Sequence, residues 1–184
     1  MEFMEALNKI VFKISQVLIQ LILIMLYFFE VVFLIGLISF IIIGLNIDNK
    51  GSINYANSSL PMNIGIKAPI IIFLIMLMIV TLIMICRFLK KIIKNLKVKQ
   101  YFIENNAVYI RNILYSFMIF IIINIILNIL TSVKKLFNIT DIFGLGKPSI
   151  INYVIYFVIL ITIYIIYNIF RYGIKVQNDS DSVI

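Results

Sequence analysis

The sequence predicts an all-α polytopic membrane protein in which four transmembrane helices pack as a bundle. Its 184 residues are 63% hydrophobic and 13% charged, with a mean hydropathy of +1.12. A soluble domain of this size has too little interior to bury that much apolar surface. Four apolar runs are each long enough to cross a hydrocarbon core, which takes roughly 20 helical residues. The charged residues are concentrated between these runs, as in loops outside a bilayer.

Each predicted span is one apolar run, and the whole chain forms a single domain. The spans cover about residues 17–45, 70–86, 113–130 and 150–170. The first is longer than the hydrocarbon core requires, so it must tilt or project beyond the core. The outer loops, about 46–69 and 131–149, contain all three prolines, Pro61, Pro69 and Pro148, as expected of turns.

Lysine and arginine are distributed unequally between the two sides of the predicted bundle. Eleven of the 16 lie in the N-terminal segment, the 87–112 connection or the 171–184 tail, and five lie in the outer loops. By the positive-inside rule, this asymmetry predicts that both termini are cytoplasmic. The abundance of Ile, Asn and Lys is typical of an AT-rich bacterial genome, so we expect a multi-pass protein of a bacterial cell membrane.

The composition argues against catalysis. Histidine is absent and Cys86 is the single cysteine, which removes internal disulfides, Cys/His zinc sites and Ser–His or Cys–His pairs. The segment "GLGKPS" at 144–149 lacks the spacing of a phosphate-binding loop. We therefore expect no enzymatic activity, no metal and no other cofactor. A membrane explains the net charge of +8 better than nucleic acid, which we do not expect as a partner.

Polar side chains form a stripe along the first predicted helix. At about 100° per residue, an arc of about 80° contains Gln16, Gln20, Tyr27 and Glu30. Such a stripe should face neighbouring helices, because lipid cannot satisfy hydrogen-bonding groups.

Glu30 has two interpretations. It is either a proton or cation site, or a protonated carboxyl hydrogen-bonded to Tyr or Asn of a neighbouring helix to fix packing. A transport path normally needs further ionisable groups in series, and no other acid or base lies at depth in a span. We therefore favour the structural interpretation.

Two other predicted helices carry polar side chains on one face. Asn124 and Asn128 are four residues apart, a spacing that predicts hydrogen bonds between helices. On the fourth helix, Tyr156 and Tyr164 share an arc with two tyrosines near the span ends. Tyrosines at span ends are common as interfacial anchors. Tyr156 and Tyr164 lie deeper, so their hydroxyls need partners.

The segment "CRFLKKIIKNLKVKQ" at 86–100 continues the second span as a basic amphipathic helix of about three turns. Its basic face comprises Arg87, Lys90, Lys91, Lys94 and Lys97. The two candidate partners of this face are anionic lipid, at roughly 1 kcal/mol per basic residue, and an acidic protein segment such as the C-terminal tail. We favour lipid.

Two segments carry a recognisable pattern: "YFIENNAVYIRNI" at 101–113 and "FRYGIKVQNDSDSVI" at 170–184. The pattern comprises Phe102, Asn106 and Arg111 in the first segment, and Arg171, Gly173 and Asp181 in the second. It resembles a bacterial four-helix membrane family catalogued only as domain of unknown function 2975. That family usually has a Gly-x-Pro turn before the Phe, where this chain has Lys99, Gln100 and Tyr101.

The resemblance implies a membrane protein that acts by binding, in signalling, immunity or a membrane-stress response. Genes of such proteins often neighbour one for a small helix-turn-helix regulator. The alternative function is a small transporter or channel built around Glu30. The sequence leaves the oligomeric state and the identity of any protein partner open.

The patterned residues also have a physical interpretation. Asn105 or Asn106 can cap the third helix. Arg111 can pair with a carboxylate of the tail or with a lipid phosphate. Gly173 can end the fourth helix with a positive φ. Two interpretations of equal weight follow: the cytoplasmic connection and the tail fold against each other, or these residues only cap helices and anchor long side chains at the interface.

Overall fold

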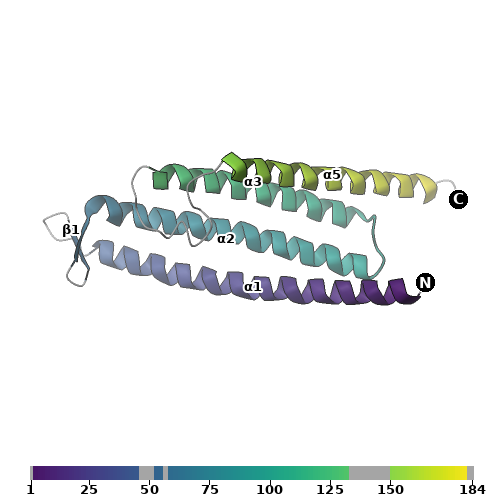
Figure 1. Cartoon of the computed structure of the whole chain (residues 1–184), viewed down its shortest axis with the longest axis horizontal. Coiled ribbons are helices and arrows are strands. Elements are labelled where there is room, and N and C mark those ends of the chain that lie inside the picture. Colours follow the sequence, from purple (N-terminus) through teal and green to yellow (C-terminus); the bar gives the residue numbers. More distant parts are fainter. Residues whose placement is uncertain (1, 46–51, 56–57, 133–149, 182–184) are drawn as a thin grey trace.

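Four long helices make up most of the computed structural model, which describes residues 2–45, 52–55, 58–132 and 150–181 (Figure 1). The helices are α1 (Glu2–Leu45), α2 (Met62–Lys97), α3 (Glu104–Ser132) and α5 (Ile150–Asp181). Each contains a stretch long and apolar enough to cross a membrane. The prediction of an all-α protein with four such helices is confirmed.

Hydroxyl groups within the apolar stretches are satisfied by the backbone of their own helix. Ser39 Oγ donates to the carbonyl of Ile35 at 2.9 Å, and Thr162 Oγ1 donates to that of Val158 at 2.8 Å. A helix also pairs its own backbone groups along its length, which a segment in lipid requires. The hydroxyls of Ser39 and Thr162 therefore need no hydrogen-bond acceptor on a neighbouring helix.

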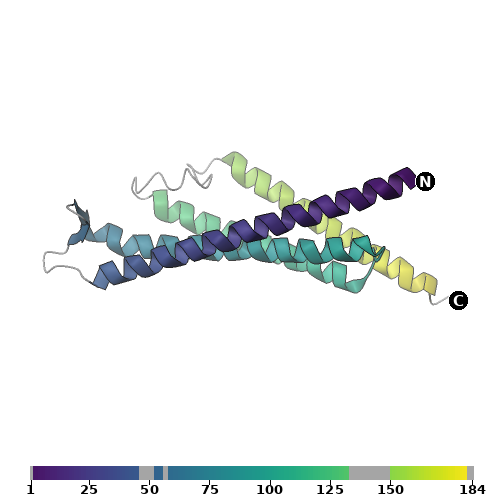
Figure 2. The ribbon, with the colours of Figure 1, turned by 90° about the horizontal axis from the view of Figure 1, so that it is seen from below.

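The helices pack in chain order: α1 on α2, α2 on α3, and α3 on α5. In Figure 1 the α1–α2 pair lies beneath the α3–α5 pair, and Figure 2 shows α1 crossing the central helices obliquely. The helices α2 and α3 therefore occupy the centre. The flanking helices, α1 and α5, expose most of their large apolar side chains, as lipid-facing helices do.

Two clusters of buried side chains hold the helices together. The larger cluster joins α1, α2 and α3 through Leu23, Ile75, Met78, Ile79, Ile83, Ile123 and Leu127. The smaller cluster comprises Ile92 of α2 with Ile110 and Ile113 of α3, and side chains of α5 pack against it. It lies toward the end that carries both termini and the 98–103 connection, which we call the basic end (Figure 1).

The helices extend past the predicted spans at the basic end. Because α2 runs unbroken to Lys97 and α3 begins at Glu104, the predicted 87–112 connection shrinks to residues 98–103. The amphipathic helix is confirmed as the last part of α2. The predicted tail is helical as far as Asp181. An apolar run in the sequence marks only the part of a helix that crosses the hydrocarbon core. The amphipathic flanks beyond it become helical because they pack on one another, so the apolar runs underestimate the length of the helices.

The opposite end contains a short hairpin where the sequence predicts loop. Strands β1 (Ser52–Tyr55) and β2 (Ser58–Pro61) pair antiparallel, and α2 follows immediately from Met62. The predicted outer loop 46–69 is therefore wrong for these residues, and Pro69 lies inside α2. Four-residue strands are too short to give a periodic signal. Residues 133–149, which hold most of the second predicted outer loop, lie outside the described part.

The end of α2 is closed by a Schellman motif. Gln100 N donates to the carbonyl of Asn95 at 3.1 Å, and Lys99 N donates to that of Leu96 at 3.0 Å. Lys99 takes a φ of 62°, in the left-handed region that glycine usually occupies at this position. The resembled family has glycine at the corresponding place in its pattern. Lys99 therefore holds a conformation that a side chain disfavours.

Lys99→Gly should stabilise the protein relative to Lys99→Ala by about 1 kcal/mol, because both remove the side chain but only glycine relieves the Cβ strain. Denaturant unfolding of the detergent-solubilised chain, followed by circular dichroism, measures the difference. An alanine variant as stable as the glycine variant would contradict the strain.

Candidate functional site

Asn106 connects three segments at the basic end. Its side chain is fully buried, at 0% exposure. Its Nδ2 donates to the carbonyls of Gln100 at 3.0 Å and Tyr101 at 2.9 Å, and its Oδ1 accepts from Asn95 Nδ2 at 2.7 Å. One amide thus binds the end of α2 and the connection to the first turn of α3. Neither Asn105 nor Asn106 is the N-cap that the sequence suggested, because α3 already begins at Glu104 and both lie inside its first turn.

Phe102 joins the connection to α5. Its ring centroid lies 5.8 Å from that of Phe170, in a tilted arrangement. Gly173 lies inside α5 beneath the same ring, and a Cβ built on it would lie 2.9 Å from Phe102 Cγ and nearer still to two other ring atoms. The prediction that Gly173 ends the helix is wrong: glycine is needed here because the ring occupies the space of a side chain. The contact between connection and C-terminal segment that one of the two interpretations predicts does form.

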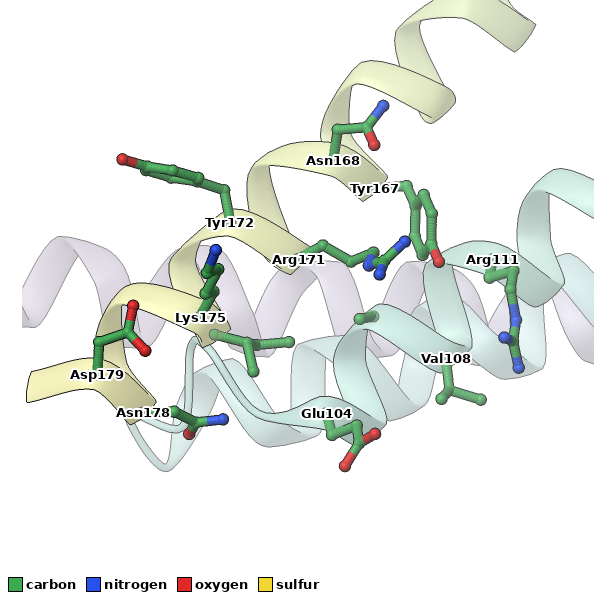
Figure 3. A pocket seen from close by; sticks show the side chains of 12 residues that line it. Glu104, Val108, Arg111, Tyr167, Asn168, Arg171, Tyr172, Lys175, Asn178 and Asp179 are labelled. Atoms are coloured by element: carbon green, nitrogen blue, oxygen red, sulfur yellow. The ribbon is translucent and has the colours of Figure 1, made fainter. Parts of the chain in front are cut away.

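A groove of about 800 Å³ lies between α3 and α5 beside this contact (Figure 3). We call it the α3–α5 groove. It is lined by Glu104, Ala107, Val108, Arg111, Tyr167, Asn168, Arg171, Tyr172, Ile174, Lys175, Asn178 and Asp179. Its lining carries three cations and two carboxylates, together with amide and phenol groups, so it can bind a ligand that presents both charge and hydrogen bonds.

The two guanidinium groups of this groove are exposed. Neither Arg111 nor Arg171 forms an ion pair with a described residue, so the expected pairing of Arg111 with a tail carboxylate is not made to Asp179. The side chain of Asp181 lies outside the described residues. Arg171 extends over Tyr167, with its guanidinium carbon 6.0 Å from the ring centroid (Figure 3). This contact orients Arg171 without neutralising its charge, because an aromatic ring carries no net charge.

Asn128 forms the hydrogen bond between helices that the sequence predicts for the pair Asn124 and Asn128. Both are buried on α3, and Asn128 Nδ2 donates to the Tyr153 hydroxyl of α5 at 3.0 Å and, within α3, to Asn124 Oδ1 at 3.0 Å. Asn128 thus holds α3 against α5, and Asn124 helps to orient the Asn128 amide.

Tyr156 and Tyr164 have different environments on α5. Tyr156 is half-buried, and its ring packs edge-on against Phe117 and Phe120 of α3 at centroid distances of 6.2 and 6.0 Å. Tyr164 is 54% exposed, and the expectation that its hydroxyl has a partner stays a prediction. A shared arc indicates direction around a helix, but α5 is flanked by one helix and can bury only part of that arc.

The polar stripe of α1 faces α2, as expected. The Tyr27 hydroxyl accepts from Arg87 Nε at 2.9 Å, and Gln20 Oε1 accepts from Lys90 Nζ at 3.4 Å. Gln16 lines the same space, which we call the α1–α2 groove. No pattern in the sequence indicates that the basic face of α2 is the partner of this stripe.

Glu30 is half-buried, about one turn from Tyr27 on α1. Its Oε2 is buried and has no hydrogen-bond partner in the described part of the chain. The hydrogen bond from Tyr or Asn that the structural interpretation requires is therefore not made to this oxygen. A buried oxygen without a partner costs free energy in either protonation state of the carboxyl, and the cost is larger when the carboxyl is charged.

Sequence reasoning missed Asn95, which holds the Asn106 oxygen, and Tyr167, which orients Arg171. An asparagine near the end of a basic helix gives no signal by itself, because its partner is fixed by the turn that follows. Among the described residues, no cluster of three or more His, Cys, Asp or Glu side chains could hold a metal ion.

Comparisons with protein-family models, with curated proteins and with solved structures found no match to this chain. The resemblance to the family of unknown function therefore stays a prediction. The structure brings five of the six patterned residues together at the basic end: Phe102, Asn106, Arg111, Arg171 and Gly173.

Gly173→Ala should lower the free energy of unfolding by about 1–3 kcal/mol, because the new methyl overlaps the Phe102 ring. Adding Phe102→Ala should recover part of this loss, a coupling that a double-mutant cycle measures. Gly36→Ala is the matched control, since a Cβ there meets no atom within 4 Å. Additive losses from the two substitutions would contradict the packing.

Proposed function

We propose that this chain is a bacterial multi-pass membrane protein that binds an acidic segment of a partner protein in its α3–α5 groove. The mixed, hydrogen-bonding lining supports binding rather than catalysis. The resemblance to the family of unknown function favours a role in signalling, immunity or a membrane-stress response, with a small helix-turn-helix regulator as one candidate partner.

The charge distribution supports an orientation with the basic end in the cytoplasm of the cell. Both termini and the 98–103 connection lie at this end (Figure 1). Eleven of the 16 lysines and arginines lie in segments that the sequence assigns to the same side. Such an excess is typical of the cytoplasmic side. In this orientation the α3–α5 groove is accessible to cytoplasmic proteins.

The observation that carries the proposal is the pair of exposed guanidinium groups in one groove. Arg171 is held by its ring contact and Arg111 projects from α3, so both present donors without a described carboxylate partner (Figure 3). Guanidinium groups bind carboxylates through two parallel hydrogen bonds, and prior orientation reduces the entropy lost on binding. An acidic peptide segment supplies the matching groups.

Arg111→Ala should reduce partner binding at least tenfold, because a hydrogen bond to a charged group contributes about 1.5–3 kcal/mol. The measurement is crosslinking in native membranes, purification of the tagged chain and quantification of co-purified proteins by mass spectrometry. Lys97→Ala is the matched control, an exposed cation that lines neither this groove nor the α1–α2 groove. The proposal predicts a protein that co-purifies with wild type and with the control but not with Arg111→Ala. If no such protein is found, the proposal is wrong.

A second candidate function, a small transporter or channel, is favoured by the unsatisfied Oε2 of Glu30. An acid at membrane depth can exchange protons if water reaches it.

Proton or cation flux into liposomes containing the purified chain should fall at least tenfold in Glu30→Gln if the carboxyl carries ions, since the amide keeps the shape and removes the proton exchange. Equal flux in wild type and Glu30→Gln would end this candidate. Tyr164→Phe, a change on the exposed side of α5, controls for reconstitution.

A further inference from the structure

The α1–α2 groove differs in charge from the α3–α5 groove. It also has a volume of about 800 Å³. The charged side chains of its lining are all cations: Arg87, Lys90, Lys91 and Lys94. Taken over the described residues, no carboxylate lines it. Four like charges on a short length of α2 repel one another, and an anion in the groove relieves that repulsion.

The contacts of these cations position them and leave their charge in place. Arg87 donates to the Tyr27 hydroxyl and lies over the same ring, with its guanidinium carbon 5.7 Å from the centroid. Lys91 Nζ lies 5.2 Å from the ring centroid of Tyr109. Phenols and rings are neutral partners, and among the described residues Nε is the one nitrogen of Arg87 that donates a hydrogen bond. Its terminal nitrogens therefore stay available to an anion.

The surface that leads to this groove is apolar. Side chains of α2 that are exposed at helical spacing comprise Ile70, Phe73, Leu77, Val80 and Met84. At about 100° per residue, Lys91 continues this face and Arg87 and Lys94 lie at its edge. The face therefore changes from apolar to cationic between Met84 and Arg87, with α1 closing one side through Gln16 and Gln20.

We propose that the α1–α2 groove binds the phosphate headgroup of an anionic phospholipid, whose acyl chains lie along the exposed apolar face of α2. Guanidinium and ammonium groups are the usual partners of phosphate oxygens. Basic pockets between membrane helices commonly bind anionic headgroups. The exposed apolar face of α2 beside the groove favours a lipid over free phosphate, because only a lipid has acyl chains to cover that face. This site is independent of the partner-binding function proposed above, because it uses the other groove.

The test is calorimetric titration of the full detergent-solubilised chain with dihexanoyl phosphatidylglycerol, dihexanoyl phosphatidylcholine and inorganic phosphate. The groove variant is Lys91→Gln with Lys94→Gln. The charge-matched control is Lys13→Gln with Lys97→Gln, which removes two exposed lysines that line neither groove. All four substitutions are of exposed residues, and circular dichroism verifies that helix content is retained.

We expect phosphatidylglycerol to bind one to one and at least tenfold more tightly than either phosphatidylcholine or phosphate. The groove variant should weaken phosphatidylglycerol binding at least tenfold and the control no more than twofold. General surface attraction, at roughly fivefold per basic residue, would weaken both variants equally, and that result overturns the site. Phosphate binding as tight as that of phosphatidylglycerol overturns the lipid assignment, and so does an unaffected groove variant.

Discussion

The buried amide of Asn106 is the interaction on which the basic end depends. A fully buried amide must find partners for its donors and its acceptor, because an unmet group costs about 1–3 kcal/mol. Here the partners come from α2 and from the turn that precedes α3. The amide therefore dictates the path of the connection. That path places Phe102 over α5, where Gly173 provides the space, and so brings the three helices into register around the α3–α5 groove.

Within the apolar stretches, the constraint is the absence of water. Hydroxyls such as Ser39 bond to their own helix, and Asn128 bonds across to Tyr153, so most described polar groups have a partner. Helix association in lipid gains little from the hydrophobic effect and relies on packing and such bonds. Glu30 differs, because its buried Oε2 has no hydrogen-bond partner among the described residues. Such a group lowers the stability of the α1 packing, and least when the carboxyl is neutral.

The four helices and the direction of the α1 stripe could be predicted because both follow from periodicity and from the cost of polar groups in lipid. The interhelical role of Asn128 was accessible for the same reason. The partner of the stripe was not, since the register of α1 against α2 depends on packing that no local pattern encodes. The role of Gly173 was misjudged likewise: glycine at a helix end and glycine beneath a ring look identical in sequence, and Phe102 is distant along the chain.

The two grooves at the basic end differ in their charge, and under the two proposals this difference selects their ligands. The lining of the α3–α5 groove contains both cations and carboxylates, so an acidic segment must match a pattern to bind there. Such mixed charge favours specific protein recognition. The α1–α2 groove presents cations alone beside an apolar face. A phospholipid needs no pattern beyond that boundary. The helices therefore form two grooves of different charge where they extend beyond the predicted spans. One lies where α2 faces α1, and the other where α3 faces α5.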